Sequence, residues 1–223
     1  MRNLPNPPLL VISDRSQTQR RIEEIALACF EGGCRWFSLR EKDLSKSERV
    51  RMLYRLVSIG ERFKATVSVH DDYDSALATG AAGVHLARDG SIARARAFLG
   101  HRGLIGISAH NSGEIRLAAV EGADYVTLSP VFASASKPGY GPALGLDGLG
   151  DGVRAVRSMP VVALGGVDAT NLESCIARGA AGVAVMGAIM RAADPKAATR
   201  DLVTRLGNAL AARGLHRHSP ASP

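Results

Sequence analysis

The sequence is poor in aromatic side chains, in cysteine and in long apolar runs. Phe, Trp and Tyr make up only 4% of its 223 residues, which leaves little flat surface for stacking on bases. The net charge is +7, but the basic residues are spread along the chain rather than clustered, so we expect no nucleic-acid partner. No stretch approaches the roughly 20 consecutive apolar residues that span a bilayer, so we expect no membrane insertion either.

Secretion is also not expected. Residues 1–8 lack the apolar core of a secretory signal. The cysteines Cys29, Cys34 and Cys175 are odd in number and have no metal-ligand spacing, which is typical of reduced packing residues. These features predict a cytoplasmic protein, and the 46% of hydrophobic residues is enough for a sizeable core.

What the sequence does contain is an internal repeat of four copies. The copies begin at Gly32, Gly80, Gly122 and Gly179. In each copy the glycine follows an amphipathic stretch, as at the C-terminal cap of a helix, and leads into a short apolar strand. The starts are roughly 40 to 60 residues apart, which is twice the length of a strand–helix unit. Four copies therefore predict eight such units.

The segments around the repeats support this count. Short aliphatic or β-branched stretches, typical of parallel strands that are buried on both faces, occupy residues 9–13, 35–40, 65–70, 83–86, 104–108, 124–128, 160–164 and 182–186. Amphipathic helical patterns lie between them, and the last one starts with Asp194 as cap and Pro195 as first residue.

We therefore predict a single parallel (β/α)8 TIM barrel over residues 1–213, followed by a disordered tail over residues 214–223. An open doubly wound sheet is the alternative. Such a sheet normally shows a glycine-rich fingerprint after its first strand, and residues 13–16 do not form one.

A barrel of this kind carries its site at the carboxyl ends of the strands. Arg40, Lys42 and Lys137 follow the second and sixth predicted strands and suit phosphate or diphosphate oxygens, to which Ser134 and Ser136 can also donate. Glycines follow the last two strands, where backbone N–H groups can hold a second phosphate. These glycines are Gly165, Gly166 and Gly187.

Other polar groups follow strands at the same end. Asp71 and Asp72 suit Mg²⁺, and His110 is able to transfer a proton. Each feature also has a structural interpretation: residues 40–42 as a solvated charge run, Asp71 as a helix cap, the glycine pair as a tight turn and His110 as a hydrogen-bonding residue. The shared location at one end of the strands favours the functional interpretation.

Seven short motifs occur in a recognisable order. They lie at residues 39–42, 70–72, 83–86, 106–110, 129–132, 134–139 and 163–166. Together they resemble the thiamine phosphate synthases, whose superfamily also contains the thiazole tautomerases of the TenI branch. The resemblance covers roughly residues 8–213. It implies a barrel that joins hydroxymethylpyrimidine diphosphate to thiazole phosphate and releases pyrophosphate.

The resemblance also implies roles for individual residues. The pyrimidine diphosphate would be held by Ser38, Arg40, Lys42, His70, Ser134, Ser136 and Lys137, and the thiazole phosphate by Gly165, Gly166, Met186 and Gly187. Ser108 would lie beside the reacting pyrimidine. The catalytic candidates are Ser108, His110 and Lys137.

The implied Mg²⁺ site departs from the pattern of the family. Asp71 matches one ligand, but the second ligand position falls on Gly90, and the neighbouring Asp89 is the candidate replacement. The synthases also usually carry Gln at the position of Ser38 and Asn at that of His70.

Two other functions stay open beside the synthase. A metal-independent thiazole tautomerase would use His110 for acid–base catalysis. A barrel that binds phosphate ligands without catalysis is the third. The expected partners are small phosphorylated pyrimidine and thiazole molecules, and the sequence leaves open whether the chain forms a homo-oligomer.

Overall fold

The computed structural model describes residues 3–133, 142–156 and 158–218. Strands and helices alternate along the chain, as the repeat predicts. The strands are β1 (Leu9–Ile12), β2 (Trp36–Leu39), β3 (Thr66–His70), β4 (Gly83–Leu86), β5 (Leu104–Ala109), β6 (Tyr125–Leu128), β7 (Val161–Ala163) and β8 (Gly182–Val185). The helices are α1 (Ile22–Glu31), α2 (Lys46–Glu61), α3 (Tyr73–Thr79), α4 (Ile92–Leu99), α5 (Ser112–Val120), α6 (Gly145–Arg154), α7 (Leu172–Ala177), α8 (Gly187–Met190) and α9 (Pro195–His218), with short 3-10 turns η1 (Arg15–Gln17) and η2 (Gly100–Arg102).

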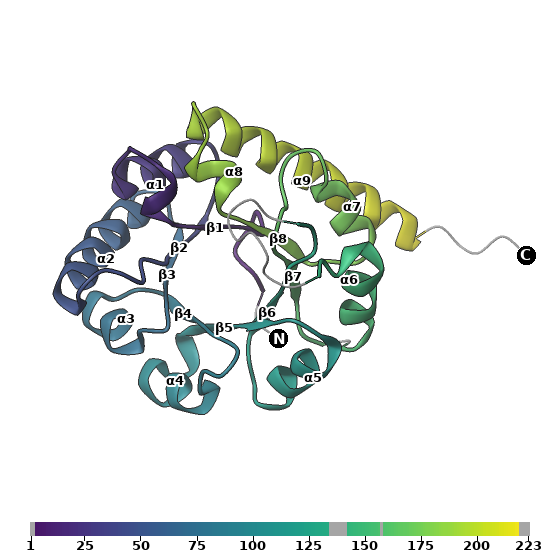
Figure 1. Ribbon diagram of the computed structural model, residues 1–223, viewed down its shortest axis with the longest axis horizontal. Coiled ribbons are helices and arrows are strands. Elements are labelled where there is room, and N and C mark those ends of the chain that lie inside the picture. Colours follow the sequence, from purple (N-terminus) through teal and green to yellow (C-terminus); the bar gives the residue numbers. More distant parts are fainter. Residues whose placement is uncertain (1–2, 134–141, 157, 219–223) are drawn as a thin grey trace, which may run out of the picture.

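The strands form one closed parallel barrel. Each strand pairs with the next one in the sequence, and β8 pairs with β1 to complete the ring. The helices surround the strands as an outer ring (Figure 1). The prediction of a (β/α)8 barrel is confirmed, and the open-sheet alternative is wrong because closure between β1 and β8 leaves no sheet edge.

The four repeats fall on every second unit, where α1 leads to β2, α3 to β4, α5 to β6 and α7 to β8. Each contains one glycine in the left-handed region: Gly33, Gly80, Gly122 and Gly179 have φ values of 101°, 70°, 86° and 100°. Glycine adopts this conformation without the clash that a β-carbon would cause. The chain can therefore turn from the end of a helix into the next strand within a few residues.

The start of α9 follows the prediction. Asp194 Oδ1 accepts hydrogen bonds from the backbone nitrogens of Lys196 and Ala197, each at 3.0 Å. The helix then continues to His218, past the domain end predicted at residue 213, so the limits of the domain and of the tail stay a prediction. Across the described part of the chain, we find no helix with both the length and the apolar character that crossing a membrane requires.

Alternation of side chains along the strands divides the apolar core in two. One set, which includes Leu9 and Val11, packs between the strands and the helices. The other set fills the barrel interior and consists of Leu10, Ile12, Trp36, Leu104, Tyr125, Val162 and Ala184. This interior packing leaves the carboxyl ends of the strands as the place for a site.

Candidate active site

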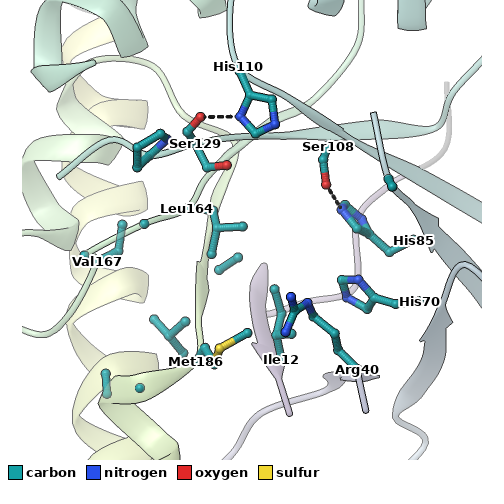
Figure 2. Close-up of a pocket in the computed structure, with 18 of the residues that line it drawn as sticks. Ile12, Arg40, His70, His85, Ser108, His110, Ser129, Leu164, Val167 and Met186 are labelled. Carbon is teal, nitrogen blue, oxygen red and sulfur yellow. Dashed lines mark hydrogen bonds between the residues drawn. The ribbon is translucent and has the colours of Figure 1, made fainter. Parts of the chain in front are cut away.

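A cavity of about 1020 Å³ lies at the carboxyl ends of the strands, a volume that suits small-molecule ligands. Most of the predicted site residues line it: Arg40, Lys42, His70, Asp71, Asp89, Ser108, His110, Gly165, Gly166, Met186 and Gly187. In Figure 2, Arg40, His70 and Ser108 lie on one side of this cavity, and Leu164 and Met186 lie across from them. The structure therefore brings together residues that the sequence places on separate strands.

Among the described residues, two predicted ones, Ser38 and Asp72, are not part of this lining. Ser38 lies in β2, two positions before Arg40, and is buried inside the barrel, where its Oγ accepts a hydrogen bond from Ser68 Oγ at 2.9 Å. Ser38 thus belongs to the barrel interior, one step away from the cavity. Ser134, Ser136 and Lys137 lie outside the described residues.

The two cations after β2 line the cavity, whereas Glu41 between them turns away from it. The Glu41 side chain is only 2% exposed, and its carboxylate accepts hydrogen bonds from the backbone nitrogen of Arg15 at 3.1 and 3.2 Å. Burial raises the pKa of Glu41. The backbone nitrogen of Arg40 in turn donates to Ser13 Oγ at 2.8 Å. These contacts tie the segment after β2 to the segment after β1, so Arg40 and Lys42 are held at the cavity.

A buried histidine connects the barrel interior to the cavity. His85 Nε2 lies 3.1 Å from Ser108 Oγ and 3.2 Å from Thr127 Oγ1, and Nδ1 lies 3.0 Å from the Tyr125 hydroxyl. Burial, helped by the positive charge of Arg40, lowers the pKa of His85 to about 3. The ring is therefore neutral at neutral pH and can orient the Ser108 hydroxyl without adding charge (Figure 2).

Sequence reasoning did not assign a role to His85. The signal that points to it is the alternation along β4, which directs His85 inward and the flanking Val84 and Leu86 outward. A polar side chain on the inner face of a barrel strand, one step from its carboxyl end, is a candidate for contact with the site.

His110 is both a hydrogen-bonded residue and a lining residue. Its Nδ1 lies 2.7 Å from the backbone oxygen of Ser129, as the dashed line in Figure 2 shows. A carbonyl oxygen can only accept, so Nδ1 carries the proton and, in the neutral ring, Nε2 carries the lone pair. This arrangement suits an acid–base role at the cavity.

The two carboxylates after β3 have different environments. Asp72 caps α3, because its Oδ1 accepts from the backbone nitrogen of Ser75 at 2.9 Å, and its Oδ2 lies 2.7 Å from Arg49 Nη1. Although burial opposes the change, the hydrogen bonds from Ser75 and the charge of Arg49 lower the pKa of Asp72. Asp72 does not line the cavity, so the candidate metal role does not extend to it. Asp71 does line it, with Oδ1 accepting from the backbone nitrogen of Ala87 at 2.5 Å.

Asp71 and Asp89 are the candidate residues that could hold a Mg²⁺ ion together with substrate oxygens. Asp71 and Asp89 both line the cavity, while the described residues contain no group of three or more His, Cys, Asp or Glu that could hold a metal. Mg²⁺ is usually held by one or two carboxylates together with substrate phosphate oxygens and water. A β-carbon at Gly90 would lie 2.7 Å from Leu86 Cβ, so a carboxylate at this position would require the loop to shift.

The glycine pair after β7 is both a turn and part of the site. Gly165 and Gly166 have φ values of 93° and 63°, and a β-carbon at Gly165 would lie 2.7 Å from Pro130 Cα. Backbone hydrogen bonds at 2.9 Å from Val131 to Leu164 and from Phe132 to Gly165 join this turn to the segment after β6. The close approach of two backbone segments therefore requires glycine here and leaves main-chain groups at the cavity.

Three charged residues line the cavity without having been assigned from the sequence. Arg88 follows β4, Asp168 follows β7 and Arg191 follows α8. Arg88 and Asp168 lie in the same kind of segment as the predicted residues, after the carboxyl end of a strand, so their position was the available signal. Arg191 follows a helix, and its position gives no such signal.

Comparisons with known proteins identify the family of this chain. A sequence model of the family described as thiamine monophosphate synthase matches residues 9–189. A thiamine-phosphate synthase of Methanoculleus marisnigri is 39% identical over 208 residues, which is 91% of this chain and 97% of the relative. Another, from Thermosynechococcus vestitus, is 39% identical over 207 residues, and the match covers 92% of this chain but only 58% of that longer protein.

Comparison with a solved structure indicates the same family. The chain resembles thiamine phosphate pyrophosphorylase from Pyrococcus furiosus with a TM-score of 0.82 and 30% sequence identity, over 91% of this chain and 96% of that one. Fold, sequence and the motifs at the cavity therefore agree with the predicted resemblance. The chain belongs to the thiamine monophosphate synthase family.

Proposed function

We propose that the chain is a transferase that joins hydroxymethylpyrimidine diphosphate to thiazole phosphate and releases pyrophosphate. The observation that carries the proposal is a single cavity with two places suited to anions. Arg40 and Lys42 supply charge at the end of β2, and the glycine segments after β7 and β8 supply main-chain donors. Two phosphorylated substrates can therefore bind beside one another, and the relatives bear the name of this activity.

The reaction breaks the bond between the pyrimidine methylene carbon and the diphosphate oxygen, and the electron pair leaves with pyrophosphate. The lone pair of the thiazole nitrogen then forms the new bond to that carbon. Arg40 and Lys42 would stabilise the charge on the leaving diphosphate. Mg²⁺, held by Asp71 and Asp89 with substrate oxygens, would supply further positive charge to the same group.

The remaining lining residues would position the reacting groups and exclude water. Ser108 Oγ, oriented by neutral His85, would contact the pyrimidine. Ile12, Leu164 and Met186 also line the cavity, and an apolar wall reduces the access of water to the electron-poor methylene carbon. Together these residues favour capture by the thiazole nitrogen over hydrolysis.

Pyrophosphate release from both substrates, measured against magnesium concentration, tests the proposal. The wild-type protein should release pyrophosphate only when both substrates and Mg²⁺ are present, and Asp71→Asn should abolish the rate. Asp74→Asn is a matched control, because Asp74 is an exposed residue on α3 that pairs with Lys46. The synthase assignment fails if the wild-type protein releases no pyrophosphate at any magnesium concentration.

One observation favours the tautomerase as a second candidate. The hydrogen bond between His110 Nδ1 and the Ser129 oxygen orients an imidazole ring that lines the cavity, and Gly90 removes one expected metal carboxylate. This function predicts metal-free proton exchange on a thiazole carboxylate phosphate, abolished by His110→Ala and retained by Asp71→Asn. If neither pyrophosphate release nor metal-free proton exchange is detected, the remaining candidate is a barrel that binds phosphate ligands without catalysis.

We also propose that the protein is cytoplasmic and that residues 1–213 form a single domain. Cys29, Cys34 and Cys175 are free and buried, which suits a reducing compartment.

A further inference from the structure

The guanidinium of Arg191 lies against Gly187, at the edge of the cavity. Arg191 directly follows α8, and its backbone nitrogen donates to the Gly187 oxygen at 3.2 Å. A β-carbon at Gly187 would clash with Nη1 and Nη2 of Arg191. The side chain therefore folds back over the residue proposed to hold the thiazole phosphate, and the missing side chain at position 187 makes the room for it.

Gln17 holds this guanidinium in place from the other side. Its Oε1 accepts a hydrogen bond from Arg191 Nη1. Its Nε2 donates to Asp14 Oδ2 at 2.6 Å and approaches Met186 Sδ at 3.3 Å. Gln17 therefore holds the guanidinium of Arg191 beside Gly187 through the oxygen of a neutral amide.

The charges around the described lining of the cavity are unevenly placed. Its cations are Arg40 and Lys42 after β2, Arg88 after β4 and Arg191 on the side of β8. On the side of β8, the neighbouring hydrogen-bond donors are the neutral main-chain groups of the glycine segments. Asp168 adds a carboxylate there, and its Oδ1 accepts hydrogen bonds from Thr170. Arg191 is thus the described cation best placed for an anion beside Gly187.

We propose that Arg191 binds the phosphate of the thiazole substrate and makes the site selective for the phosphorylated form. A guanidinium presents a planar fork of donors that matches two phosphate oxygens, and charge-assisted hydrogen bonds are stronger than those from neutral amides. The inference rests on the proposed function and deepens it. It assigns recognition of the phosphate charge to a side chain, where the sequence motifs point to main-chain groups alone.

Kinetics of single variants test this role. Arg191→Gln should raise KM for thiazole phosphate about tenfold, as expected for the loss of one charge-assisted hydrogen bond, and leave KM for the pyrimidine diphosphate unchanged. The KM of Arg191→Lys for thiazole phosphate should lie between those of the wild type and Arg191→Gln, because lysine keeps the charge but lacks the planar fork of donors. Arg205→Gln is the matched control, since it removes one exposed arginine on α9 that does not line the cavity.

A binding measurement separates this inference from the proposed reaction. In calorimetry without the pyrimidine substrate, the Kd for thiazole phosphate should rise about tenfold in Arg191→Gln, while the Kd for the unphosphorylated thiazole alcohol should not change. Gly187→Ala should also weaken phosphate binding by displacing the guanidinium, and adding Arg191→Gln to it should have little further effect.

The outcomes are distinct. If the wild-type protein binds thiazole phosphate in this way but releases no pyrophosphate, the synthase proposal fails and the role of Arg191 stands. If Arg191→Gln binds both thiazoles as the wild type does, or if the wild type does not prefer the phosphorylated form, the role of Arg191 is overturned.

Discussion

At the scale of single residues, burial determines the chemistry of His85. Its ring is enclosed by Tyr125, Thr127 and Ser108, and taking a charged imidazolium out of water is costly. The folded protein therefore keeps this ring neutral down to low pH. Neutrality suits a residue that orients a hydroxyl next to a substrate whose reacting carbon becomes positively charged.

This burial gives stability a measurable pH dependence. The pKa of His85 is about 3 in the folded protein against a usual 6.5, so between these values the unfolded chain binds a proton that the folded chain does not. The stability contribution is complete above pH 6.5 and is lost as the pH falls toward 3. When the pH falls from 6.5 to 5, the free energy of unfolding of the wild type, measured by urea denaturation, should decrease by about 1 to 2 kcal/mol more than that of His85→Gln.

The control for this comparison is His101→Gln, which removes an exposed histidine from η2. Its free energy of unfolding should follow that of wild type across the same pH range. An equal loss of stability in wild type and His85→Gln would contradict the buried, neutral state of His85.

Arg40 carries a separate prediction at this scale. Arg40→Gln should raise KM for the pyrimidine diphosphate by about tenfold or more, because the loss of a charge-assisted hydrogen bond costs on the order of 1.5–3 kcal/mol. Arg51→Gln, an exposed site on α2, controls for the change in net charge. For Lys137, the sequence alone predicts that Lys137→Ala lowers turnover by at least about tenfold, through the loss of a similar charge-assisted hydrogen bond. Unchanged kinetics in Arg40→Gln would remove Arg40 from the diphosphate site.

At the scale of elements, close contact between α1 and α9 helps to complete the outer ring of helices. A β-carbon at Gly32, directly after α1, would lie 2.7 Å from the Lys196 backbone oxygen and 2.8 Å from Thr199 Cβ. Thr199 is fully buried, and its hydroxyl donates to the Pro195 oxygen at 2.7 Å. The first and last helices thus meet through a residue that has no side chain.

Substitution of two glycines, one directly after α1 and one within α9, should change the free energy of unfolding in opposite directions. Gly32→Ala forces a β-carbon against backbone and should lower the free energy of unfolding by about 1–3 kcal/mol. Gly207→Ala lies in α9 with nothing within 4 Å of the added β-carbon, so it should raise stability by about 0.5–1 kcal/mol through better helix propensity. Urea denaturation of both variants checks the signs, and a stable Gly32→Ala protein would contradict the close contact.

At the scale of the whole molecule, the periodicity of the sequence was sufficient to predict the barrel. The repeated glycines mark the helix-to-strand turns, and the aliphatic stretches mark strands that are covered on both sides. The carboxyl ends of those strands then indicated Arg40, Lys42 and Asp71 as members of one site. These features could be predicted because they depend on local sequence and on the general topology of the fold.

The parts that could not be predicted depend on three-dimensional packing. Asp72 rather than Asp71 caps α3, because only its carboxylate reaches both Ser75 and Arg49. Ser38 lies one step too deep in the barrel, and its hydroxyl is used by Ser68. Arg191 follows a helix rather than a strand, and only the folded side chain shows that its guanidinium returns to Gly187.

The packing inside the barrel also gives the protein an optical probe of its own site. Trp36 is the only tryptophan of the chain, it is fully buried, and its ring centroid lies 4.8 Å from that of Tyr125, whose hydroxyl contacts His85. Fluorescence excited selectively at tryptophan therefore originates from one point in the barrel, connected to Ser108 through Tyr125 and His85. Unfolding should shift this emission to longer wavelength as the indole enters water, and substrate titration can be followed by the same signal without attaching a dye.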